Sequence, residues 1–188
     1  MIPVIAVSPN GEWMVTGSAF KPARLWNMQD PSNPIPSEIP NSGNFLAQVA
    51  FSPDGRWLAT SSWYKDATVW DLSAKSPLSS PYLTPGGSVP VAFSRDSRWC
   101  VAGTRVIDLL AKSTKMELRG HTLGVSSVAI TSDNRWVVTG GLDGAARMWE
   151  MNLDTLVARA RKTIGRELSP KERELYSVPA KNDEANVP

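Results

Sequence analysis

The chain is poor in the residues that build most catalytic and metal sites. Its 188 residues include one His and one Cys, so it can form no internal disulfide and no His/Cys zinc set. The net charge is only +2, which argues against DNA, RNA or an acidic membrane surface as the partner. No apolar run approaches the roughly 20 residues of a membrane span, and Met1-Ile2-Pro3 opens no signal peptide. We therefore expect a cytoplasmic protein without a metal or cofactor.

Turn-forming residues and tryptophan are abundant instead. The chain has 15 Pro, 13 Gly and 8 Trp, and all eight Trp lie within four similar segments. Those segments are residues 5–27, 49–72, 91–109 and 128–151. Their equivalent residues Val7, Phe51, Phe93 and Ile130 are separated by 44, 42 and 37 positions. Such self-similarity predicts a repeat architecture.

The pattern is clearest in residues 116–151. Apolar runs at 125–130, 136–139 and 146–151 are separated by two clusters of Ser, Asp, Asn and Gly. Short apolar runs between such turn residues predict an antiparallel sheet with tight hairpins.

This segment resembles the repeat of the WD-repeat β-propeller family. The resemblance rests on Gly120-His121, Asp143-Gly144 and Trp149-Glu150, where the family has Trp-Asp. It implies an all-β protein of about four four-stranded antiparallel blades, at about residues 1–44, 45–87, 88–119 and 120–151. Outer strands are expected near 38–40, 82–84 and 116–119, and the third repeat is expected to have lost its second hairpin turn after Gly103.

The region after residue 151 changes character. Its apolar residues Leu153, Leu156, Val157, Ala160 and Ile164 follow a helical spacing. A capping box at Ser169 predicts a second short helix that runs to about Tyr176. We expect a helical tail over residues 152–178, which either packs on the propeller or binds a partner, and disorder over 179–188.

The resemblance also bears on how the propeller is completed. The chain begins on an inner strand, and its fourth repeat has no outer strand before the tail. We expect an incomplete propeller, the C-terminal part of a larger one, with a freestanding four-bladed ring as the alternative. Open blade faces would favour self-association.

The family resemblance implies one set of structural site residues. In the family, a buried hydrogen-bonded network links a His, a Ser or Thr, an Asp and a Trp, and here it would comprise His121, Thr139, Asp143 and Trp149. Only the fourth repeat carries the complete set. A catalytic acid–base role for His121 and Asp143 is the alternative, but no partnered nucleophile is evident, so we name no catalytic residue.

A second set of residues is expected to bind a partner. Phe20, Trp63, Tyr64 and Lys65 occupy hairpin tips where a turn needs no large aromatic side chain. Aromatic residues beside Lys have the composition of binding hot spots, although Trp63 could equally cover a gap between blades. We predict a non-catalytic protein–protein interaction scaffold, the sensor or docking portion of a larger bacterial signalling protein. The alternative is a freestanding small propeller with an enzymatic or ligand-binding funnel.

Overall fold

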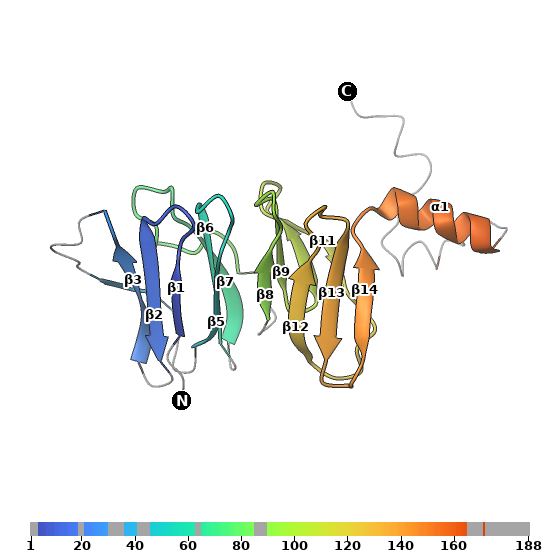
Figure 1. Ribbon diagram of the computed structural model, residues 1–188, viewed down its shortest axis with the longest axis horizontal. Helices are drawn as coiled ribbons and strands as arrows, with labels where there is room; N and C mark the ends of the chain where they lie inside the picture. Colours follow the sequence, from blue (N-terminus) through green and yellow to red (C-terminus); the bar gives the residue numbers. More distant parts are fainter. Residues whose placement is uncertain are drawn as a thin grey trace, which may run out of the picture. The chain divides into compact units, whose positions relative to one another are not determined.

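The computed structural model describes residues 4–18, 21–29, 36–40, 46–62, 65–84, 90–164 and 171. The chain divides into two units, Met1–Trp149 and Glu150–Pro188, which we describe separately. The described residues of the first unit form four antiparallel sheets, which we call the first to fourth blades (Figure 1). The predicted all-β fold with a short C-terminal helix is confirmed within the described residues.

The strands follow one another in chain order within each blade. The first blade comprises β1 (Val4–Val7), β2 (Trp13–Ser18), β3 (Lys21–Asn27) and β4 (Ser37–Glu38). The second comprises β5 (Leu46–Phe51), β6 (Trp57–Ser62) and β7 (Lys65–Asp71). The third comprises β8 (Val91–Phe93), β9 (Trp99–Ala102), β10 (Arg105–Asp108) and β11 (Ser113–Glu117). The fourth comprises β12 (Val125–Ile130), β13 (Trp136–Gly141) and β14 (Ala146–Glu150).

The outer strands differ from their predicted positions. β4 and β11 each begin before the expected residues, and the expected strand at 82–84 is reduced to a bridge between Val69 and Leu83. These edges pair on one side only and carry little apolar pattern, so the sequence specifies them weakly.

The second hairpin turn of the third blade is shortened, which corrects the expectation that it was lost. Ala102 pairs with Arg105, so Gly103 and Thr104 alone connect β9 to β10. Gly103 has a φ of 57°, and two-residue hairpins favour Gly at such positions because the backbone enters the left-handed region.

The turn between the first two strands of each blade has one repeated construction. In the second blade, the Ser52 hydroxyl accepts the Trp57 backbone N–H at 2.8 Å and donates to the Asp54 carboxylate at 2.5 Å. Ser8, Ser94 and Thr131 make the equivalent bonds in the other blades. The same turn position has a positive φ in all four blades, at Gly11, Gly55, Ser97 and Asn134.

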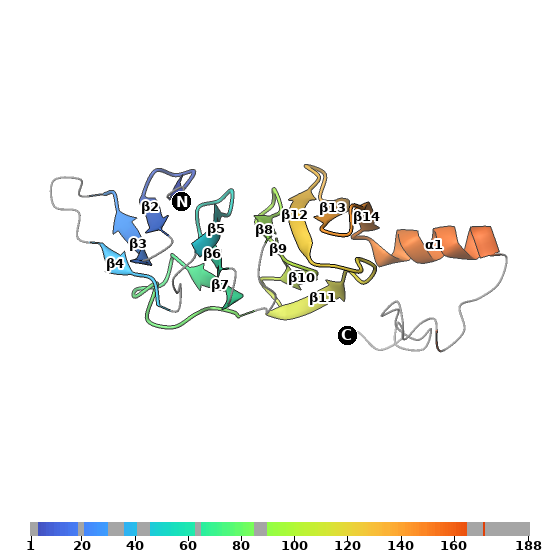
Figure 2. The ribbon, with the colours of Figure 1, turned by 90° about the horizontal axis from the view of Figure 1, so that it is seen from below.

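The blades pack through their flat faces. We call the face of each sheet that carries the third-strand Trp, or Ile107 in the third blade, its front, and the opposite face its back. The front of the second blade, with Leu58 and Trp70, packs against Val15 and Leu25 on the back of the first. The front of the third blade packs in the same way against the back of the second. The inner strands β1, β5, β8 and β12 are neighbours in that order (Figure 2).

Hydrogen bonds cross between blades at both ends of the inner strands. The Asp54 backbone N–H donates to Ser97 Oγ at 3.1 Å, and the Arg95 N–H donates to Asn134 Oδ1 at 3.2 Å. Elsewhere, the Val91 N–H donates to Gln48 Oε1 at 2.8 Å. These bonds fix the register of neighbouring blades, which apolar packing alone would leave less specific.

The second unit contains helix α1 (Leu153–Ile164), as the apolar spacing predicted. Asn152 caps it, because its side-chain Oδ1 accepts the N–H groups of Asp154 and Thr155 at 3.0 and 3.2 Å. Apart from Lys171, the second predicted helix lies outside the described residues, as do residues 179–188. Among the described residues, no helix is long and apolar enough to cross a membrane.

Candidate functional site

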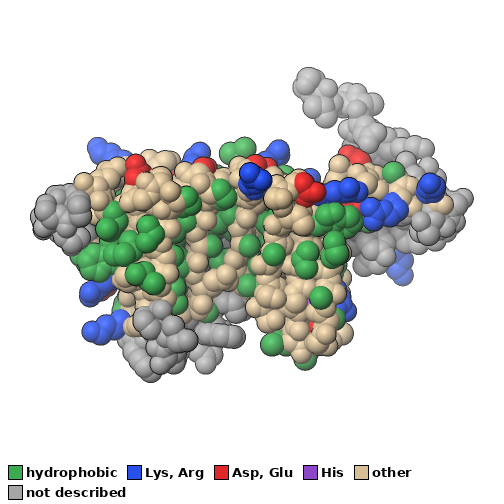
Figure 3. Space-filling view, viewed as in Figure 1, with side chains coloured by type: hydrophobic (Ala, Val, Ile, Leu, Met, Phe, Trp, Pro, Cys, Tyr) green, Lys and Arg blue, Asp and Glu red, His purple; other side chains and the backbone are tan. Residues whose placement is uncertain are grey.

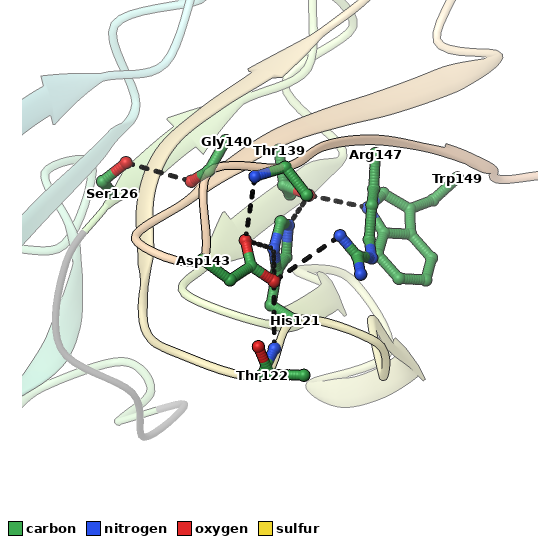
Figure 4. Close-up of polar contacts among 9 residues, drawn as sticks. His121, Thr122, Ser126, Thr139, Gly140, Asp143, Arg147 and Trp149 are labelled. Atoms are coloured by element: carbon green, nitrogen blue, oxygen red, sulfur yellow. Dashed lines mark hydrogen bonds and ion pairs between the residues drawn. The ribbon is translucent and has the colours of Figure 1, made fainter.

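The fourth blade brings together the four residues expected to form a polar network (Figure 4). His121 precedes β12, Thr139 lies on β13, Asp143 lies in the turn between β13 and β14, and Trp149 lies on β14. The sequence therefore supplies one member from each of four consecutive stretches, and the hairpins fold them onto the front of the sheet.

The hydrogen bonds form a continuous chain. His121 Nδ1 lies 2.9 Å from Asp143 Oδ1, and His121 Nε2 lies 2.8 Å from Thr139 Oγ1. Trp149 Nε1 donates to the same Thr139 oxygen at 2.8 Å. With a neutral imidazole, only one assignment of donors and acceptors satisfies every contact. Trp149 donates to Thr139, Thr139 donates to His121, and His121 donates to Asp143.

The carboxylate of Asp143 is held in its charged form. The hydrogen bond from His121 is the main reason why its pKa falls from 3.8 to about 2. The backbone N–H groups of Thr122 and Ala145 also donate to it, at 3.0 and 3.1 Å. Arg147 Nη1 lies 3.6 Å from Asp143 Oδ2 and adds a positive charge.

Gly141 makes room for this network, which sequence reasoning did not anticipate. A Cβ atom on Gly141 would collide with His121 Nδ1 and Asp143 Oδ1. The second blade has Ser62 at the same position and no histidine among its described residues. The sequence signal for this role of Gly141 was that the fourth repeat has Gly where the second repeat has Ser62.

The order carboxylate, imidazole, hydroxyl is also that of a nucleophilic triad. The low exposure of these three side chains argues against a nucleophilic role. The side chain of His121 is 1% exposed and that of Asp143 is 7% exposed, while Thr139 is fully buried. The Thr139 oxygen is further engaged by the indole of Trp149. A substrate carbonyl cannot reach a hydroxyl in this position, so the arrangement is suited to structure rather than to acyl transfer.

The other blades retain only parts of this chain. Trp26 Nε1 donates to Thr16 Oγ1 at 2.9 Å in the first blade, and Trp70 Nε1 donates to Thr60 Oγ1 at 3.3 Å in the second. The third blade has Ala102 and Ile107 at these two positions, which exclude the bond.

The residues predicted to bind a partner cannot be placed. Phe20, Trp63 and Tyr64 lie outside the described residues, and Lys65 is described only as the first residue of β7. The docking surface therefore stays a prediction.

The described ranges show no metal site. They contain no cluster of three His, Cys, Asp or Glu side chains able to hold a metal ion. Cys100 is buried in an apolar core, and this burial raises the pKa of its thiol to about 12. Such a thiol is inert at neutral pH.

Comparison with known proteins bears on two parts of the chain. Residues 39–71 and 112–150 match the family model described as "WD domain, G-beta repeat". The matched segments take in all the strands of the second and fourth blades and β11 of the third, and they include the polar network described above.

Two curated proteins are similar over shorter stretches. The U3 small nucleolar RNA-associated protein 21 homolog of Schizosaccharomyces pombe is 31% identical over 78 residues, which cover 38% of this chain and 9% of that protein. The ribosome biogenesis protein BOP1 homolog of Arabidopsis thaliana is 41% identical over 39 residues, which cover 21% of this chain and 5% of that protein. Neither source is bacterial, so these relatives lend no support to the expected bacterial origin. The chain thus spans less than a tenth of either relative.

Proposed function

We propose that the chain is a non-catalytic scaffold whose blades bind a protein partner. Two of its segments match a WD-repeat family, and repeat proteins of this kind present extended binding surfaces. The names of the two relatives connect those proteins with small nucleolar RNA and with ribosome biogenesis. A net charge of +2 favours a protein partner over direct contact with RNA for this chain.

One observation carries the non-catalytic part of this proposal. The most catalysis-like constellation in the described residues is sealed, because Thr139 is fully buried and both of its neighbours use its hydroxyl. His121 and Asp143 therefore act on the stability of the fourth blade.

A ligand-binding cavity is the second candidate function. A hollow of about 350 Å³ lies among the inner strands, within the size range of small-molecule sites. Its lining residues are Ala47, Gln48, Pro90, Val125, Ser126, Ser127, Val128 and Leu142. None of these side chains titrates, so the cavity favours binding of a small neutral ligand rather than acid–base chemistry.

The scaffold role is tested at the predicted hairpin tips. A partner is first identified by crosslinking to the full chain and is then purified for titration. Trp63→Ala and Tyr64→Ala should each weaken binding by about 1 kcal/mol or more. Lys75→Ala, an exposed loop residue, is the matched control and should bind as the unaltered protein does. Normal binding by both aromatic variants would remove this surface from the proposal.

The non-catalytic role is tested with His121→Ala. Because one link of a buried network is broken, this variant should lose about 1–3 kcal/mol of unfolding free energy while binding of the purified partner persists at low temperature. An activity lost by the variant at unchanged stability would contradict the proposal. Membership of a bacterial signalling protein has no support in the comparisons and stays a prediction.

A further inference from the structure

The turn between the first two strands of the first blade differs from its three counterparts. Asn10 and Glu12 stand where each of the other blades has an Asp and an Arg. Those residues are Asp54 and Arg56, Asp96 and Arg98, and Asp133 and Arg135. Figure 3 shows acidic and basic side chains along the upper edge of the blades, where these turns lie in Figure 1. Asn10 is followed by Gly11, which makes the only Asn-Gly pair in the sequence.

Hydrogen bonds hold the Asn10 amide at both of its ends. Its Oδ1 accepts the Ser8 hydroxyl at 2.6 Å and the Glu12 backbone N–H at 3.2 Å. Its Nδ2 donates to Glu12 Oε2 at 2.9 Å. The Gly11 backbone N–H donates to the Ser8 carbonyl oxygen at 2.9 Å. The side-chain amide and the backbone nitrogen that follows it are thus both engaged within the turn.

The Asn10 side chain also lies against the second blade. A Cβ atom placed on Gly55 would be 2.7 Å from Asn10 Nδ2, so the amide fills the space beside that glycine. At the same turn position, Ser97 and Asn134 accept hydrogen bonds from the preceding blade and bridge the next two junctions. A chemical change at Asn10 would therefore alter both its own turn and the junction between the first and second blades.

We propose that Asn10 is a deamidation site, which the folded turn protects and which reacts when the first blade opens. The Gly11 nitrogen loses its proton and attacks Asn10 Cγ, and the Cγ–Nδ2 bond breaks as ammonia leaves with that proton. Water then opens the resulting succinimide at either carbonyl carbon, which gives aspartate or isoaspartate. Water is the only co-reactant, and Gly11 suits the reaction because no side chain hinders its nitrogen.

The protection comes from hydrogen bonds and not from burial. Asn10 and Gly11 are both exposed, so water has access to the amide. For the attack, the amide must turn toward the Gly11 nitrogen and give up its bonds to Ser8 and Glu12. Because several hydrogen bonds must be lost together, the folded chain should react at least about tenfold more slowly than the unfolded chain.

Either product should weaken the turn. Aspartate at position 10 has no N–H group to donate to Glu12, and it places a second carboxylate beside the first. Isoaspartate adds a methylene group to the backbone of a tight turn. Asn10→Asp reproduces the first product and should lower the Tm by about 2 °C or more. Asn10→Asp combined with Glu12→Arg should recover most of this loss, because it recreates the Asp and Arg of the other three turns.

The reaction is measured on the full chain at mildly alkaline pH, once folded and once in guanidinium chloride. Peptide mapping by mass spectrometry follows the amide-to-acid conversion at residue 10. Asn134, which is followed by the bulkier Arg135, is the internal control and should stay an amide for much longer in both conditions.

Two variants test the protecting hydrogen bonds. Glu12→Ala removes the acceptor of the amide N–H and should raise the rate in the folded chain about threefold or more. Glu12→Gln is the matched control, because it retains an acceptor oxygen and should react at about the rate of the unaltered chain. Circular dichroism verifies that both variants are folded.

Three results would overturn the inference. Residue 10 could remain an amide in guanidinium chloride, which would remove the site. The folded and unfolded chains could react at equal rates, or Glu12→Ala could react no faster than Glu12→Gln, which would mean that the turn gives no protection. The variants alter neither the predicted hairpin tips nor the polar network of the fourth blade, so failure here would leave the proposed scaffold role untouched.

Discussion

The third and fourth blades fill equivalent positions on their front faces with different kinds of side chain, apolar in the third and hydrogen-bonded in the fourth. On the front of the fourth blade, Thr139 and Trp149 belong to a hydrogen-bonded chain that ends on Asp143. At the equivalent positions the third blade has Ala102 and Ile107, both buried and apolar. The two blades nevertheless share the same antiparallel strand order. The polar chain is therefore one way to fill the front of a blade and is not a condition for forming one.

The members of the polar chain are absent together in the third blade for a physical reason. Its hairpin has only Gly103 and Thr104 between strands, which leaves no position for the turn carboxylate. Without that carboxylate, a buried imidazole would lack its acceptor, and an unpaired buried polar group costs about 1–3 kcal/mol. Replacement of the whole set by apolar residues removes that cost.

The largest expected effect is in the apolar blade. Ile107→Ala should lower the unfolding free energy by about 3 kcal/mol, because it opens a cavity among buried side chains. Urea unfolding measures the loss. The exposed Leu110→Ala should stay within about 0.5 kcal/mol of the unaltered protein. A loss below about 1 kcal/mol for Ile107→Ala would mean that the third blade does not depend on this packing.

The next effect concerns the space that the polar chain occupies. Gly141→Ala should cost about 2 kcal/mol, because the new methyl group collides with His121 and Asp143, which are fixed by their hydrogen bonds. Gly124→Ala is the control, since a Cβ there meets only Leu142 Cδ1, at 3.7 Å.

The same substitution can be repeated in a His121→Ala background to isolate the cause. Removal of the imidazole frees the space, so the cost of Gly141→Ala should fall by at least about 1 kcal/mol. Equal costs in the two backgrounds, again measured by urea unfolding, would assign the effect to the backbone instead.

A smaller effect should depend on pH. The pKa of Asp143 is lowered from 3.8 to about 2 in the folded protein, so its stabilising contribution is complete above 3.8 and is lost as the pH falls toward 2. Asp143→Asn should therefore show a flatter decline of Tm over this range than the unaltered protein. His121→Ala should show a similar flattening, because the histidine N–H is the main cause of the shift. Parallel curves for all three proteins would contradict the assignment.

The smallest effect is expected in the second blade. The hydroxyl of Ser61 is buried and has no hydrogen-bond partner among the described residues, so Ser61→Ala should leave stability unchanged or raise it by up to about 1 kcal/mol. The neighbouring Thr60→Ala is the contrast, because Thr60 accepts the indole N–H of Trp70 and its loss leaves a buried donor unpaired. Thermal melts compare the two, and a clear loss in Ser61→Ala would reveal a partner for its hydroxyl.

The sequence was most informative where local chemistry decides the structure. In each blade, a Ser or Thr two residues before an Asp or Asn marks the turn between the first two strands, because the bonds that build this turn lie within five residues. The burial of Ile107 could not be predicted in this way, because it depends on packing against the second blade, which is distant in the sequence. Gly141 was missed because its role is visible only once His121 lies beside it. The outer edge of the second blade was expected as a strand at residues 82–84 and is reduced there to a bridge at Leu83, because a one-sided pairing leaves little pattern in the sequence.

The rate at which the buried thiol of Cys100 reacts with a reagent can report local opening of this protein. A thiol with a pKa of about 12 has almost no thiolate at neutral pH, and the Cys100 thiol is fully buried between the second blade and the other strands of the third, where a reagent cannot reach it. A maleimide can therefore react only in molecules whose third blade has opened. Because the chain has a single Cys, the labelling rate reports that one event without any engineered probe.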